Sequence, residues 1–113
     1  MELVNRTKHT VLADKVEVLN TLKEKTDGLL HRTEPAAVFM RTRWGIHTVG
    51  MHFAIDCAVC DEQGIVRACA RALPPGKFFF WNPRHRSVYE LPAGTLARTG
   101  TEPGDRLEMR ERV

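Results

Sequence analysis

The sequence FAIDCAVCDEQGIVRACARA at residues 53–72 predicts a β-hairpin. Two mostly apolar runs flank Asp61-Glu62-Gln63-Gly64, which has Asp at the first position of a type I turn and Gly at the fourth. Pairing of Asp61 with Ile65 across this turn places Cys57 directly opposite Cys69. We therefore expect these two thiols to be neighbours, and to be reduced in a cytoplasmic protein.

Short apolar segments on both sides of this hairpin predict further strands. Apolar residues around Asp14-Lys15 predict one strand over residues 10–19, bent or bulged at that pair. Other strands are expected at residues 37–40, 87–91 and 107–109, the last as a charged edge strand. Short helices are expected at about residues 21–30 and 92–100, the second stopped by Gly100. The predicted fold class is α+β, mostly β: a compact, mainly antiparallel sheet or partly open barrel with two short helices.

The composition is that of one small soluble domain spanning residues 1–113. Hydrophobic residues make up 42% and charged residues 27%, and the net charge of +3 is too mild and dispersed to indicate nucleic acid by itself. No apolar run approaches the roughly 20 residues of a membrane span, and residues 1–6 lack the apolar core of a signal peptide. Three cysteines, an odd number, favour a reducing cytoplasm. We expect a cytoplasmic domain.

The cysteine and histidine spacings do not indicate a metal site. Cys57 and Cys60 have the spacing of a redox or metal half-motif, but on a strand residues three apart point to opposite faces. No second Cys-x-x-Cys completes a four-ligand site. His47 and His52 share a face in neither a helix nor a strand. We expect no metal and no cofactor.

Residues 78–81, Phe-Phe-Phe-Trp, hold four of the eight aromatic residues and precede Arg84, His85 and Arg86. Rings beside cations could stack on a single-stranded nucleic acid or a sugar. The favoured interpretation is that alternate rings are buried in the core, because small domains obtain much of their buried area from aromatic side chains. An exposed pair of rings would mark an interaction surface.

Asp56 lies inside an apolar run, where a carboxylate is costly without a partner. That partner is expected to be Arg43, Arg86 or main-chain N–H groups. The structural interpretation is a buried pair or a carboxylate that braces a turn. The functional one is a polar cleft in which an arginine faces a ligand's carboxylate. The residues expected to line that cleft are Arg43, Trp44, His47, Met51, Asp56, Arg86 and Glu90.

Four ordered blocks of the sequence resemble a known family. They are residues 50–56 (GMHFAID), 61–66 (DEQGIV), 90–95 (ELPAGT) and Gly100 with 104–107 (GDRL). In this order they resemble the domain-of-unknown-function 192 family. The resemblance implies a compact β-rich single domain and brings no established activity, substrate or cofactor. Ala54 stands where the family commonly has proline, and Cys57 and Cys60 stand where it usually has aliphatic residues.

Three functions remain open from the sequence. The first is a non-enzymatic domain that binds a small ligand or a protein partner in the polar cleft. The alternative is a hydrolase or lyase using Asp56 or Glu90 with His47 as acid and base. The second alternative is single-stranded nucleic-acid binding through residues 78–81 with Arg84 and Arg86. No catalytic residue is assigned and enzymatic activity is left open. Nucleic acid is disfavoured as a partner, no membrane association is expected, and the chain is expected to be a monomer or weak dimer.

Overall fold

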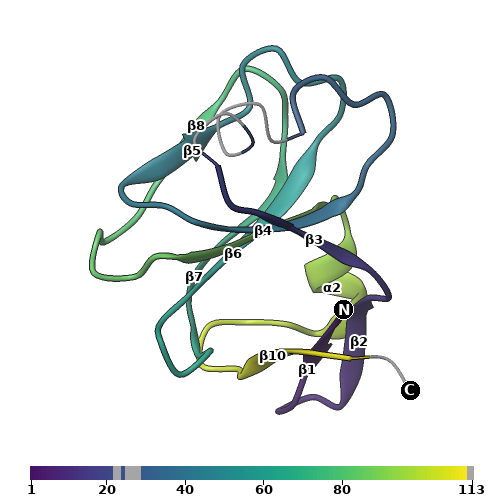
Figure 1. Cartoon of the computed structure of the whole chain (residues 1–113), viewed down its shortest axis with the longest axis vertical. Helices are drawn as coiled ribbons and strands as arrows, with labels where there is room; N and C mark the ends of the chain where they lie inside the picture. Colours follow the sequence, from purple (N-terminus) through teal and green to yellow (C-terminus); the bar gives the residue numbers. More distant parts are fainter. Residues whose placement is uncertain (22–23, 25–28, 112–113) are drawn as a thin grey trace.

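The computed structural model describes residues 1–21, 24 and 29–111, which form a body with a radius of gyration of 12.7 Å (Figure 1). Its elements are β1 (Glu2–Asn5), β2 (Thr10–Ala13), β3 (Val16–Leu19), β4 (Ala37–Arg41), β5 (Gly45–His47), β6 (Ile55–Cys60), β7 (Val66–Leu73), β8 (Phe78–Phe80), β9 (Ser87–Pro92), α2 (Thr95–Thr99) and β10 (Leu107–Arg110). The first expected helix, at about 21–30, lies largely outside the described residues. No helix of the described part is long and apolar enough to cross a membrane.

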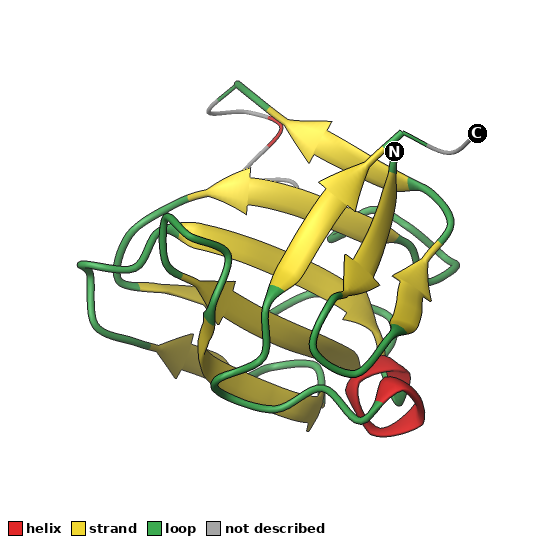
Figure 2. Cartoon of the chain, turned by 90° about the horizontal axis from the view of Figure 1, so that it is seen from below, coloured by secondary structure: helices red, strands yellow, loops and turns green. Residues whose placement is uncertain are grey.

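The strands form three sheets, which confirms a mostly β protein and corrects the expectation of one sheet or a partly open barrel. The central sheet has the order β3-β4-β9-β6-β7, with β3 and β4 parallel and the other pairs antiparallel. A second sheet has the order β10-β1-β2, and β5 and β8 form a two-stranded ribbon. Figure 2 shows α2 at one edge of the stacked strands. The β10 strand is an edge strand, as expected.

The single strand expected over residues 10–19 is wrong, because the chain changes sheet at Asp14-Lys15. β2 pairs with β1 in the three-stranded sheet, whereas β3 pairs with β4 in the central one. Leu12 and Val16, on either side of the crossing, pack into the same core. Leu12 and Val16 therefore fill one core from two different sheets, whereas Leu19 packs into the other core.

The hairpin at residues 53–72 is confirmed as β6 and β7, but its register is not. Gly64 has a φ of 82° and donates to the Asp61 carbonyl at 3.0 Å, as the turn requires. The register then shifts by one residue beyond the Cys60–Val66 pair, so Cys57 lies opposite Ala70 and Cys69 lies opposite Ala58. Because a shift of one residue exchanges the two faces of a strand, Cys57 and Cys69 point to opposite sides of the sheet. Their expected juxtaposition is wrong.

The central sheet is covered on both faces, so β6 is buried along its whole length and β9 at its four central residues. One core, which includes Tyr89, Leu91 and Leu96, lies between this sheet, the three-stranded sheet and α2. The other, which includes Val88 and Trp81, lies on the face toward the ribbon. Alternate residues of β9 thus enter different cores, and a single-residue step along the strand changes the face on which a side chain lies.

The second expected helix is confirmed as α2, followed by Gly100 at a φ of 67°. β1 was not expected, because four residues beginning at Glu2 are too short to show a period. It lies between β10 and β2, and an ion pair of 2.7 Å joins Glu2 to Arg110. The strands β1 and β10, which are far apart in the sequence, therefore pair in one small sheet.

Candidate binding surface

Asp56 is a structural carboxylate held by main-chain amides. It is 1% exposed, and its two oxygens accept hydrogen bonds from the N–H groups of Ala72 and Leu96, each at 2.8 Å. The expected donor is thus the main chain and neither Arg43 nor Arg86. Leu96 lies in the first turn of α2, so the carboxylate occupies the position that an external anion would take at the start of a helix.

Asp56 and Glu90 lie on opposite faces of the central sheet. In the β6–β9 pair, Glu90 is the partner of Cys57 and Asp56 is the partner of Leu91. The Glu90 side chain therefore faces the core that contains Cys57, whereas Asp56 faces the core that contains Leu91. The two carboxylates do not line one cleft.

Glu90 is a nearly buried acid without a described partner. It is 5% exposed, and no described residue is hydrogen-bonded or ion-paired to its carboxyl group. Burial raises the pKa of Glu90 to about 7. The side chain therefore titrates near neutrality for lack of solvation rather than through a catalytic neighbour.

The other predicted cleft residues separate into a core residue and an exposed group. Met51 is buried in the core beneath the ribbon. Trp44 and His47 belong to the outer side of the ribbon, and Arg43 directly precedes Trp44. Arg86 is brought close to this segment because the Thr42 N–H donates to the Arg86 carbonyl at 3.0 Å. The structure thus brings four of the seven predicted residues into one exposed region.

The β5–β8 ribbon separates the aromatic run into buried and exposed rings. Phe79 and Trp81 face the core, with ring centroids 5.6 Å apart. Phe78 and Phe80 are 62% and 68% exposed, and their rings lie parallel within 7° at a centroid distance of 6.0 Å. The expected burial of alternate rings is confirmed, and Phe78 and Phe80 form an exposed apolar pair.

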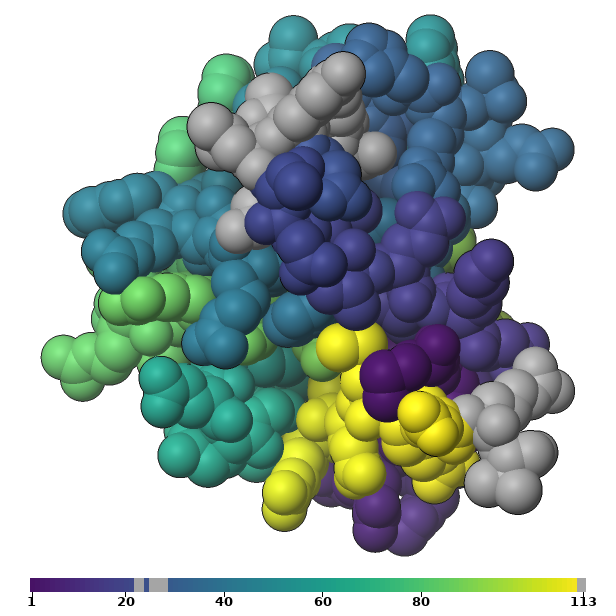
Figure 3. Space-filling view, viewed as in Figure 1, coloured from purple at the N-terminus to yellow at the C-terminus, as the bar shows by residue number. Residues whose placement is uncertain are grey.

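Two further side chains extend this exposed pair. Trp44 is 66% exposed, and the His47 ring lies 6.0 Å from that of Phe78, its partner across the ribbon. We call the group Trp44, His47, Phe78 and Phe80 the ribbon face. In Figure 3 the blue-teal segment around residue 45 and the green segment around residues 80–86 project from the same side of the molecule.

The ribbon is held in place by Thr48, a residue that the sequence analysis missed. Thr48 is fully buried, and its hydroxyl donates to the Pro74 carbonyl at 2.6 Å and accepts from the Lys77 N–H at 2.9 Å. Its own N–H donates to the Lys77 carbonyl at 2.8 Å. Nothing in the local sequence distinguishes Thr48 from an ordinary loop threonine. These bonds fix one end of the ribbon face.

Gly45 allows the Phe80 ring to lie across β5. A Cβ at Gly45 would lie 2.5 Å from Cδ1 of Phe80 and 2.6 Å from the Phe79 carbonyl oxygen. Next to it, Trp44 has a φ of 74°, and its carbonyl accepts a hydrogen bond from the Trp81 N–H at 3.0 Å. A non-glycine residue in this region carries backbone strain, so a strained tryptophan is held at the end of the ribbon.

Exposed arginines without acidic partners lie beside the ribbon face. No carboxylate of a described residue pairs with Arg41, Arg43 or Arg86, whereas Arg6, Arg32, Arg67 and Arg110 each pair with one. Arg41 ends β4 opposite Ser87. The loop that carries Arg86 is anchored by a hydrogen bond of 2.8 Å from Nε1 of Trp81 to the His85 carbonyl. The backbone that carries these arginines is therefore held by rigid elements.

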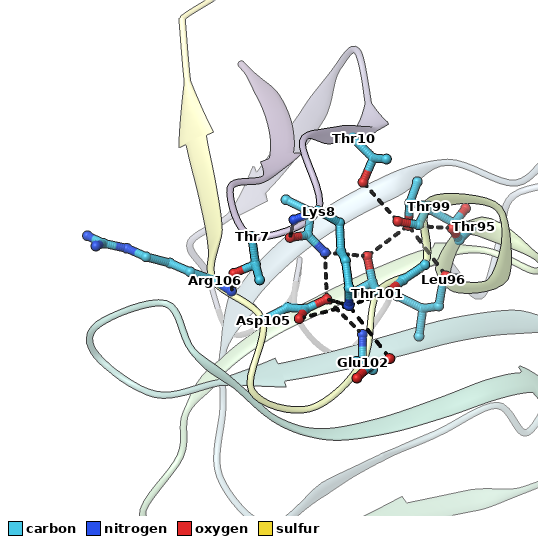
Figure 4. A network of polar contacts seen from close by, with 12 residues as sticks. Thr7, Lys8, Thr10, Thr95, Leu96, Thr99, Thr101, Glu102, Asp105 and Arg106 are labelled. Carbon is cyan, nitrogen blue, oxygen red and sulfur yellow. Dashed lines mark hydrogen bonds and ion pairs between the residues drawn. The ribbon is translucent and has the colours of Figure 1, made fainter.

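A second polar cluster, shown in Figure 4, is structural. Asn5 donates from Nδ2 to Thr101 at 3.0 Å and to Asp105 at 2.9 Å, and the Lys8 ammonium lies 2.8 Å from Asp105. Burial by itself raises the pKa of Asp105, but hydrogen bonds from Lys8 and Asn5 outweigh it and hold that pKa below its usual value. Every polar group named here has a partner. Through Asn5 and Lys8, these contacts join the end of β1 and the turn after it to Thr101 and Asp105, which precede β10.

The comparisons with known proteins agree on the fold. The family profile DUF192, described as Uncharacterized ACR, matches residues 3–109. A crystal structure of a protein of unknown function from Novosphingobium aromaticivorans DSM 12444 is similar at 21% identity, with a TM-score of 0.83 over 96% of this chain and 84% of that one. One from Sinorhizobium meliloti 1021, described as a proposed transcription regulator, is similar at 22% identity, with a TM-score of 0.78 over 95% of this chain and 89% of that one. No curated protein matches significantly.

Proposed function

This chain belongs to the DUF192 family, and we propose that it is a non-enzymatic binding domain whose contact surface is the ribbon face. The observation that carries the proposal is the parallel pair of exposed rings, Phe78 and Phe80, on a ribbon whose inward residues already fill the core. Folding requires only the inward set, Ile46, Phe79 and Trp81, so polar residues at the outward positions would preserve the core. Clustered exposed rings on a rigid support are typical of a contact surface.

The placement of the acidic groups favours binding over acid–base catalysis. Both oxygens of Asp56 are occupied by main-chain amides, and Glu90 lies on the other face of the sheet. His47 is exposed on the ribbon next to Phe78. An acid and a base must reach the same substrate, and no such convergence supports the hydrolase or lyase alternative.

We place this binding function in the cytoplasm, in a chain that is a monomer or weak dimer. The three cysteines are free thiols, and Cys57 and Cys69 point to opposite faces of the sheet. A reducing compartment suits such an arrangement. Charged side chains along β10 protect its free edge from pairing with a second copy.

The test is a titration of ¹⁵N-labelled protein, followed by NMR, with a panel of small anions, oligosaccharides, peptides and short oligonucleotides. The expected result is that at least one class shifts the amide signals of residues 44–47 and 78–80, and that Phe78→Ala with Phe80→Ala abolishes the response. Val18→Ala, which truncates an exposed apolar side chain on β3, is the control and should leave it unchanged. Silence across the panel, or shifts confined to the surroundings of Asp56 or Glu90, would contradict the proposal.

A further inference from the structure

Taking the ribbon face as the contact surface, which rests on the function proposed above, we propose that its ligand is a single-stranded nucleic acid. Bases would stack on Phe78, Phe80 and Trp44, and phosphates would lie beside the unpaired cations at the two ends of the ribbon.

The first argument is the segregation of charge along the chain. No Asp or Glu occurs between Glu34 and Asp56 or between Glu62 and Glu90, while these two segments contain seven of the 17 Lys and Arg residues. They are the segments that build the ribbon and its flanking loops. The ribbon and its flanking loops therefore contribute only cationic charges of their own, which the mild net charge of +3 does not reveal, and Asp61 and Glu62 adjoin this surface at Arg84 and His85. Such a surface attracts a polyanion.

The second argument is where the cations stand relative to the rings. Arg43 precedes Trp44 at the end of the ribbon where Phe80 pairs with Gly45, and Arg86 is tied to the same end through Thr42. Exposed Lys77 precedes Phe78 at the other end. Cations thus bracket the ring pair along the ribbon. A strand lying along the ribbon places its bases over the rings and its phosphates near both ends.

The third argument is that the chemistry of the ribbon face selects among ligands. A neutral sugar is usually held by carboxylates and amides around a ring, whereas the ribbon face offers imidazole and aromatic groups, with arginines in the adjoining loops. A duplex hides the faces of its bases, whereas a single strand exposes them, and every base has a face on which an aromatic ring can stack. The sequence expectation that disfavoured nucleic acid rested on a mild charge dispersed along the chain and on burial of the aromatic run, and two of those rings are exposed.

The structure also supplies a reason for the strain at Trp44. Trp44, at a φ of 74° and 66% exposed, lies outside the core and directly before Gly45, whose strand partner is Phe80. Strained residues commonly cluster at ligand-contact sites. Together, Gly45 and Thr48 preorganise this platform, so binding requires little additional ordering.

The test measures fluorescence anisotropy of labelled dT12 and rU12 with the whole chain between 50 and 200 mM salt. We expect affinity that falls with salt and that is much weaker for a DNA duplex of the same length. Phe78→Ala and Phe80→Ala should each weaken binding about fivefold or more, the effect of losing one stacked base. Arg43→Gln and Arg86→Gln should each reduce the salt slope by about 0.7, as expected for one lost phosphate contact.

Arg106→Gln is the charge-matched control, because Arg106 is exposed and directly precedes β10, which lies at the other end of the molecule from β5 and β8 (Figure 1). This variant should change neither the salt slope of binding nor the contribution of base stacking to the affinity. Thermal melts should show that the ring variants remain folded, since both rings are exposed.

The possible outcomes separate this inference from the proposed function. Absence of oligonucleotide binding, with ribbon-face shifts produced by a peptide or another ligand, would overturn the nucleic-acid assignment and leave the contact surface standing. Oligonucleotide binding that Phe78→Ala and Phe80→Ala leave unchanged would overturn both. Equal affinity for duplex and single strand would overturn the stacking model.

Discussion

Asp56 accepts a hydrogen bond from the main-chain N–H of Leu96, 40 residues later in the chain, at 2.8 Å. Its other oxygen accepts from Ala72, which has a φ of 49° at a register shift of the β6–β7 pair. One buried carboxylate therefore joins the central sheet, an irregular point in β7 and the start of α2.

Asp56→Asn should lower the free energy of unfolding by about 2–4 kcal/mol. Asparagine retains one acceptor oxygen, and its NH₂ group would face an N–H donor, so one buried amide loses its partner. The measurement is urea denaturation. Asp61→Asn is the control: Asp61 also accepts two main-chain amides, from Gln63 and Ile65, but both on Oδ1, an oxygen that asparagine retains, and its other oxygen pairs with the half-exposed Arg67. Equal losses for the two variants would contradict the structural role assigned to Asp56.

Glu90→Gln should raise stability at alkaline pH. Because burial raises the pKa of Glu90 to about 7, the folded protein retains a proton that the unfolded chain releases above its usual value of 4.5. The stability due to protonated Glu90 is full below about pH 4.5 and falls as pH rises to 7, by up to about 3 kcal/mol. Glutamine resembles the protonated acid.

Melting temperatures of wild type and Glu90→Gln, measured from pH 4.5 to 8.5, should therefore agree near pH 4.5 and diverge progressively up to about pH 7. Glu17→Gln provides the opposite case, because the hydrogen bond from Arg32 lowers the pKa of Glu17 and that variant loses an ion pair at pH 8. Parallel profiles for wild type and Glu90→Gln would show that Glu90 is solvated as an ordinary surface acid.

Trp44→Asn should stabilise the fold by about 1 kcal/mol, because asparagine tolerates the left-handed conformation better than tryptophan. The same variant should lose affinity at the ribbon face. Chemical denaturation measures the first effect. Val49→Asn, another exposed loop substitution at a residue without a positive φ, should give no such gain. A less stable Trp44→Asn would mean that the indole contributes more to folding than its exposure indicates.

The aromatic run should show opposite responses to truncation at neighbouring positions. Trp81→Ala should cost about 3 kcal/mol or more, since the ring is buried in the core and its Nε1 holds the His85 carbonyl. Phe80→Ala should change stability by less than about 1 kcal/mol. Thermal unfolding of the two variants makes the comparison. A large loss for Phe80→Ala would assign that ring to the core.

The cysteines should react slowly with a thiol reagent at pH 7.5. Burial raises the pKa of Cys57 and Cys69, and raises that of Cys60 to about 12, so the reactive thiolate is scarce. Cys69, which is only half-buried, should react first, and all three should react on unfolding. Cys69→Ser should leave the folded protein inert. Rapid labelling of Cys57 or Cys60 would instead support a redox role for these two cysteines.

Local conformational demands made several features predictable. The turn at Asp61–Gly64 and the helix stop at Gly100 follow from positive φ values that glycine adopts without strain. The exposure of Phe78 and Phe80 with burial of Phe79 and Trp81 follows from the two-residue period of a strand. The need of Asp56 for a donor follows from the cost of burying a charge. Each of these depends on a residue and its immediate neighbours.

Which strands pair with one another, and in which register, depended on the whole chain. The change of sheet at Asp14-Lys15 and the shift that separates Cys57 from Cys69 depend on which strands lie alongside. The same pairing places Asp56 and Glu90 on opposite faces, and the irregular point at Ala72 leaves an amide free for Asp56. The sequence by itself therefore determined turns, alternation and family, while tertiary structure alone determined which groups meet, because pairing across a sheet is set by contacts distant in sequence.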